Sequence, residues 1–168
     1  MSNEFARRLR DIVDGVRSEA EARHRLRAPE VGAAKARRRH LEKAAVVEAG
    51  LLVTQAGPVF ASLGMRSTAT ATEIRVEPIP GARLTEEFPP WLRISCRTAA
   101  FEAVRVAVLE MTWRVDDPRT PLPESPNTVR LVVDDDSAAG MAEVREFVSV
   151  AMEDFAANVT KYDVLPKA

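Results

Sequence analysis

The sequence has little cysteine and little histidine, and this excludes several kinds of site. Its 168 residues include a single cysteine, Cys96, and two histidines, His24 and His40. One cysteine allows no internal disulfide and no cysteine-based zinc site. Both histidines fall in charged helical surroundings without an evident third ligand. We therefore predict no metal site and no cofactor.

The familiar catalytic motifs are also lacking. The seven glycines are scattered and form no phosphate-binding loop, and no Gly-x-Ser-x-Gly elbow occurs. Cys96 falls on the inward face of a predicted strand, where cysteine usually acts as a small apolar residue. The run from Asp134 to Ser137 could hold a divalent cation, but it lacks the spacing of a calcium loop and better fits a helix cap. We therefore expect no catalytic residues.

The sequence has no long uninterrupted run of apolar residues. The opening residues MSNEFARRLRDIVD lack the apolar centre of a signal peptide, so we expect a cytoplasmic protein. Residues 44–65 are long enough for a membrane span and follow the basic run KARRRHLEK at 35–43. However, Glu48, Gln55 and Pro58 make this segment poorly apolar, which disfavours a membrane anchor.

Charge is unevenly distributed along the chain. Residues 1–43 carry twelve Lys or Arg against seven Asp or Glu, about +5, whereas residues 44–168 carry twelve against eighteen, about −6. The apolar fraction of 46% and charged fraction of 29% are typical of a soluble globular protein. The bias toward alanine, arginine and valine is typical of a bacterial source. A basic arm on an acidic body favours interaction with a partner.

The amino-terminal third shows a helical repeat. Apolar side chains within residues 4–27 form one stripe at spacings of three and four: Phe5, Leu9, Ile12, Val16 and Ala20. Pro29 and Gly32 then predict a break, and a second helix follows over residues 33–63. Two helices joined by a short break predict an antiparallel helical hairpin, which we assign to residues 1–65.

After residue 65 the repeat of apolar residues shortens to two, which predicts strands. Alternation and turn residues indicate strands over 70–78, near 82–88, over 91–97 and over 128–134. In the valine-rich segment 101–115, both the odd-numbered and the even-numbered positions carry apolar residues. It predicts either a strand covered on both faces or a bulge near Ala107, with a helix over 99–111 as the alternative.

The last segment, residues 137–162, predicts an amphipathic helix with an apolar stripe that includes Val144, Val148 and Phe155. The complete pattern predicts the α+β class: an amino-terminal helical hairpin, an antiparallel sheet of about four to five strands, and a carboxy-terminal helix packed on the sheet. We place a boundary between residues 1–65 and 66–168, although the two parts could form one continuous domain.

Three functions fit this pattern, and the first is the one we favour. It is a non-catalytic interaction or assembly protein that forms a homo-oligomer or binds a protein partner through its helical arm. The apolar part of the second predicted helix would supply the contact. The partner-binding residues would be Leu51, Leu52, Val59, Phe60 and Leu63.

The second function is nucleic-acid binding. A hairpin that turns near residues 29–32 would gather basic residues from both helices at its tip, and such a cluster could contact several phosphates. Its residues would be Arg25, Arg27, Lys35, Arg37, Arg38 and Arg39. No aromatic residue lies between positions 21 and 45, so stacking on bases is not expected there.

The third function is binding of a small ligand between the sheet and the last helix, since sheets covered by a helix often leave cavities. The expected lining consists of apolar residues from two strands and the last helix: Leu92, Ile94, Val106, Met111, Trp113 and Phe155.

Overall fold

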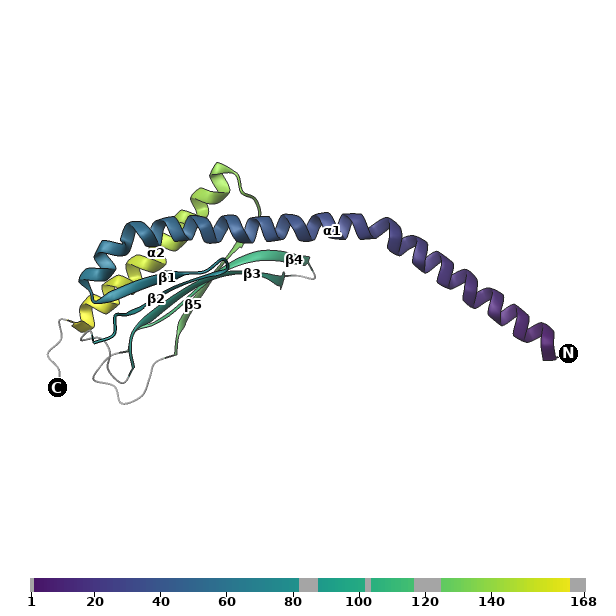
Figure 1. Cartoon of the computed structure of the whole chain (residues 1–168), viewed down its shortest axis with the longest axis horizontal. Helices are drawn as coiled ribbons and strands as arrows, with labels where there is room; N and C mark the ends of the chain where they lie inside the picture. The colour runs from purple at the N-terminus through teal and green to yellow at the C-terminus, as the bar shows by residue number, and fades with distance from the viewer. Residues whose placement is uncertain (1, 82–87, 102–103, 117–124, 164–168) are drawn as a thin grey trace. The chain divides into compact units, whose positions relative to one another are not determined.

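The structure of the chain, a computed structural model, describes residues 2–81, 88–101, 104–116 and 125–163. This described part holds a helix, five strands and a second helix, in that order (Figure 1). The elements are α1 Ser2–Ser62, β1 Met65–Ala69, β2 Glu73–Pro78, β3 Trp91–Phe101, β4 Val104–Arg114, β5 Asn127–Val133 and α2 Ala138–Asp163. The predicted α+β class, with its antiparallel sheet and carboxy-terminal helix, is confirmed.

Helix α1 is a single helix of 61 residues, so the hairpin predicted from Pro29 and Gly32 has to be corrected. A proline inside a helix removes one backbone hydrogen bond and costs about 3 kcal/mol, and a glycine costs about 1 kcal/mol. The flanking sequence is rich in alanine, arginine and glutamate, which have high helix propensity. The helix therefore continues through both residues.

Two compact units divide the chain, and the division falls inside α1, between Arg37 and Arg38. The described part of the first unit is helix alone. In the second unit, α1 supplies buried core residues at a spacing of four: Leu41, Ala45, Ala49 and Val53. We placed the boundary after residue 65, whereas the division between the two compact units falls before Leu41, from which α1 buries one face.

Small side chains bring this part of α1 close to the sheet. Ala45 and Ala49 are completely buried. At Gly50, an added Cβ would lie 3.7 Å from Cδ1 of Ile74 on β2, which is ordinary van der Waals contact. Close packing of this kind is how a helix with short side chains covers a sheet without leaving a void.

The five strands form one antiparallel meander in the order β1-β2-β3-β4-β5. The pairing of β3 with β4 runs without interruption from Trp91 opposite Arg114 to Phe101 opposite Val104. Segment 101–115 is therefore largely strand, as we expected, and the alternatives of a helix or a bulge near Ala107 are excluded. The strand predicted near 82–88 falls mostly on residues 82–87, which lie outside the described part.

One face of the sheet is covered by α2 and by the part of α1 that belongs to the second unit (Figure 1). Side chains on that face alternate along each strand, as a half-covered sheet requires. They include the most buried residues of the sheet: Ile74, Val76, Leu92, Ile94, Cys96, Leu109 and Met111. The opposite face carries most of the charged residues of the strands.

Helices α1 and α2 are joined at three levels. His40 contacts Asp136 just before α2, Glu48 pairs with Arg145, and the rings of Phe60 and Phe155 lie 6.2 Å apart. From the first contact to the third, the residue numbers increase on both helices. The two helices therefore run in the same direction across the sheet. The buried stripe of α2 agrees with the sequence, since Val144, Val148 and Phe155 are all fully buried.

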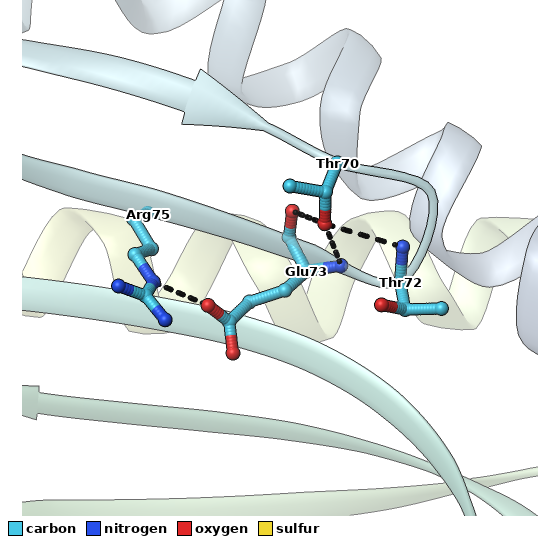
Figure 2. Close-up of polar contacts among 4 residues, drawn as sticks. All are labelled: Thr70, Thr72, Glu73 and Arg75. Atoms are coloured by element: carbon cyan, nitrogen blue, oxygen red, sulfur yellow. Dashed lines mark hydrogen bonds and ion pairs between the residues drawn. The ribbon is translucent and has the colours of Figure 1, made fainter.

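A threonine organises the turn between β1 and β2, where the sequence predicted continuous strand from residue 70. The Thr70 hydroxyl accepts hydrogen bonds from the backbone N–H of Glu73 at 3.1 Å and of Thr72 at 3.4 Å (Figure 2). The same hydroxyl donates to the carbonyl oxygen of Glu73 at 3.1 Å. Local bonds of this type compete with the strand ladder and close the chain into a turn.

Candidate functional site

The lone cysteine lies where the sequence placed it, on the helix-covered face of β3. Burial, with a smaller contribution from the charge of Glu42, raises the pKa of the Cys96 thiol to about 12. A thiol with this pKa stays protonated at neutral pH, and the thiolate is the reactive form. Cys96 is therefore a core residue whose thiol stays protonated at neutral pH.

His40 and the acidic run make structural contacts, and His24 is exposed. Nε2 of His40 lies 2.8 Å from Oδ2 of Asp136. The carboxylate of Asp135 accepts a hydrogen bond from the Ser137 N–H at 2.8 Å, and the Ser137 hydroxyl accepts one from the Gly140 N–H at 3.1 Å. This is the geometry of a helix amino terminus. Within the described residues, no group of three His, Cys, Asp or Glu side chains is placed to hold a metal ion.

The residues predicted to line a ligand pocket form packed core instead. Five of the six are buried members of the hydrophobic core: Leu92, Ile94, Met111, Trp113 and Phe155. Val106 lies on the opposite face of the sheet. Side chains alternate between the two faces along the regular strand β4, so even-numbered residues point away from the face that holds Leu109 and Met111.

The predicted basic cluster depended on the hairpin, and without the hairpin the cluster does not form. Arg25 and Lys35 lie ten residues apart along one helix, which corresponds to roughly 15 Å at about 1.5 Å per residue. Arg25 is paired with Glu21 at 3.6 Å, one helical turn before it. Arg38 is half-buried, whereas Arg27, Lys35, Arg37 and Arg39 are exposed.

Of the residues predicted to bind a partner, two are exposed and three are not. Leu51 and Val59 expose 54% and 56% of their surface, while Leu52 and Leu63 are half-buried against the core. Phe60 is only 2% exposed and belongs to the core, where it packs against Phe155. The sequence could not separate these positions, because the segment is apolar nearly all round.

Helix α1 also raises the question of a membrane. Over the described residues it is the one helix long and apolar enough, by length and composition alone, to cross a bilayer. Of its most apolar window, 28% is buried inside the protein. Core residues such as Ala49 and Val53 account for that burial, and a core helix of this composition passes the same test.

The first unit exposes several apolar residues. Every side chain that the structure describes between Arg7 and Arg37 is exposed. Ile12 and Val16, one turn apart, expose 62% and 64% of their surface. The side chains of Phe5 and Leu9, which complete the predicted stripe, lie outside the described part.

The sheet face away from the helices is rich in ion pairs. Arg130 and Arg97 both contact one carboxylate oxygen of Glu110, at 2.6 Å and 3.3 Å. The hydrogen bond from Arg130 is the largest of the effects that hold the pKa of Glu110 below its ordinary value, and Arg97 adds to it. Arg66 pairs with Glu77 at 3.0 Å on the neighbouring strands. Glu110 and Glu77 are thus both engaged by arginines.

A cavity of about 550 Å³ lies where β2 ends and β3 begins. Four prolines contribute to its wall: Pro78, Pro80, Pro89 and Pro90. Arg75, Trp91 and Arg93 line it as well, and all three lie on the sheet face away from the helices. The sequence did not predict this site, because the pairing of Arg75 with Arg93 depends on a strand register that no local pattern specifies.

Comparisons with known proteins do not identify the chain. No family model, no curated protein and no solved structure matches it. The function of the chain therefore has to be inferred from its own residues and contacts.

Proposed function

We propose that this protein is a non-catalytic assembly protein whose amino-terminal helix pairs with the same helix of a second copy. The observation that supports this most strongly is the exposure of Ile12 and Val16 on a helix whose described side chains are all exposed from Arg7 to Arg37. Isolated helices are marginal in water, and most helical stability in proteins comes from packing of an apolar face. Pairing would cover that face.

The charges beside the stripe favour pairing between identical helices. Arginine and acidic residues alternate along the first unit, and two intrahelical pairs are formed, Arg23 with Glu19 and Arg25 with Glu21, both at 3.6 Å. A helix that carries both signs along its length can meet a copy of itself without large repulsion. Apolar residues at spacings of three and four provide the seam.

The test is the mass of the full-length protein in solution, measured by light scattering over a range of concentrations. We expect a dimer or higher oligomer that dissociates on dilution. Val16→Glu places a charge in the seam and should yield a monomer. Ser18→Glu adds the same charge at an exposed position outside the stripe and should leave the oligomer intact.

Two results would contradict the proposal. One is a wild-type monomer at the highest concentration. The other is an oligomer that survives Val16→Glu unchanged, because the contact would then lie elsewhere, with the exposed Leu51 and Val59 as the next surface to test.

Nucleic-acid binding is a second proposal. It is supported by Lys35, Arg37 and Arg39, which are exposed and have no acidic partner among the described residues. Binding to a short DNA duplex at low salt, followed by fluorescence anisotropy, should weaken steeply as salt rises. If Arg37→Ala with Arg39→Ala does not change the affinity or its salt dependence, this proposal is wrong.

A further inference from the structure

Two arginines lie directly opposite each other on neighbouring strands. Arg75 of β2 is paired in register with Arg93 of β3. Like charges in this position repel, because opposed side chains on one sheet face come within about 5 Å at their Cβ atoms. The row that holds them continues through Thr68, Thr112 and Thr128, so no acidic residue in that row offsets the repulsion.

The acidic residues in adjacent rows are already engaged. Glu77 is paired with Arg66, and Glu110 with Arg97 and Arg130. Glu73 contacts Nε of Arg75 (Figure 2), and among the described residues the terminal nitrogens of Arg75 have no hydrogen bond or ion pair. Arg93 has no acidic partner among the described residues, unlike the other arginines on this face of the strands. The pair therefore keeps donors free for an anion.

The surroundings of the two arginines add a flat apolar wall. Trp91 is two residues before Arg93 on the same strand face, and both line the cavity of about 550 Å³. Proline rings make much of the remaining wall and offer no N–H donors. An indole face favours stacking with a planar ring, and a cavity of this size is within the range of small-molecule sites.

We infer that this cavity binds a small planar aromatic molecule that carries one carboxylate or phosphate group. The anion lies between the guanidinium groups of Arg75 and Arg93, where paired hydrogen bonds to a carboxylate or phosphate are strongest. The ring stacks on Trp91 against the prolines. Glu77 also lines the cavity, but its charge is offset by Arg66 at 3.0 Å.

Four matched probes test the site by isothermal titration calorimetry on the full-length chain. 2-Naphthoate and 2-naphthyl phosphate carry the ring with each kind of anion, 2-naphthol carries the ring alone, and inorganic phosphate carries the anion alone. We expect at least one of the ring-bearing anions to bind more tightly than both partial probes. Comparison of the two ring-bearing anions identifies the preferred anion.

Variants locate the binding. Arg93→Gln should weaken it roughly tenfold or more, since a hydrogen bond to a charged group contributes about 1.5–3 kcal/mol. Trp91→Leu should weaken the ring-bearing probes but leave inorganic phosphate unchanged. Arg97→Gln removes an equal charge from the same sheet face outside the cavity and should have little effect.

Three outcomes would overturn the inference. The first is no heat of binding with any probe at about 5 mM, a concentration that reveals even millimolar Kd values. The others are equal affinities for inorganic phosphate and the ring-bearing anions, or equal losses of affinity in Arg93→Gln and Arg97→Gln. None of these results depends on the oligomeric state, so they are independent of the assembly proposal.

Discussion

Helix α1 passes through two different environments along its length. Up to Arg37 every described side chain is exposed, whereas from Leu41 onward one face of the same helix is part of a packed core. The helical backbone is the same on both sides of this division. The comparison teaches that helix propensity extends an element, but tertiary contacts determine which part of it belongs to a stable unit.

The difference between the two parts is a difference in buried apolar surface. Full burial of a Val, Leu or Phe side chain stabilises a fold by about 1.5–3 kcal/mol. In the second unit α1 contributes Leu41, Val53 and Phe60 to such burial, whereas Ile12 and Val16 in the first unit are exposed.

The largest expected effect comes from removing a ring at the junction of α1 and α2. Phe155 is fully buried against Phe60, so Phe155→Ala should lower the free energy of unfolding of the second unit by about 3–5 kcal/mol. Val150 on the same helix is 61% exposed, and Val150→Ala should change it by less than about 0.5 kcal/mol. Urea denaturation measures both, and similar losses would show that the α1–α2 contact is not part of the core.

An intermediate effect on helix stability is expected at Pro29 and Gly32, the two residues of α1 with the lowest helix propensity in this region. Pro29→Ala restores a backbone donor and should stabilise the local helix by up to about 3 kcal/mol, while Gly32→Ala should contribute about 1 kcal/mol. An added Cβ at Gly32 would meet nothing within 4 Å. Hydrogen exchange of amides near residue 30 should slow, and the urea midpoint of the second unit should stay unchanged. A shift of that midpoint would mean that the two units unfold together.

A smaller effect concerns pH. Burial raises the pKa of the Cys96 thiol from 9.0 to about 12, so the folded state holds this proton more tightly than the unfolded state. The resulting stabilisation is complete below pH 9 and is lost as the pH rises from about 9 toward 12. Between those values the wild type should lose on the order of 1 kcal/mol per pH unit relative to Cys96→Ala, whose cavity cost does not depend on pH. Parallel stability curves for the two proteins would contradict this assignment.

Several parts of the fold could be predicted because the local pattern was decisive. The stripe of Val144, Val148 and Phe155 repeats with the helical period, and Ile74 and Val76 alternate with charged residues. Both patterns correspond to one covered face. Asp135 and Ser137 also sit where capping chemistry predicts them.

Other parts could not be predicted because they depend on competition between distant contributions. Pro29 and Gly32 are breaking signals, and only the summed propensity of the flanking residues carries α1 through them. Within the apolar segment after Ala44, the sequence gives no means to tell the buried Phe60 from the exposed Val59. The choice is made by the surface on which the helix lies.

By itself, the sequence determined the periods of the chain: 3.6 residues in its helices and two in its strands, together with a shortage of catalytic and metal-binding motifs. The strand registers and the side-chain contacts, including Arg75 opposite Arg93 and Phe60 against Phe155, emerge only when the elements pack together. The physical reason is that periodicity is a local property of neighbouring side chains, whereas register and burial are set by the free energy of packing the whole sheet against both helices.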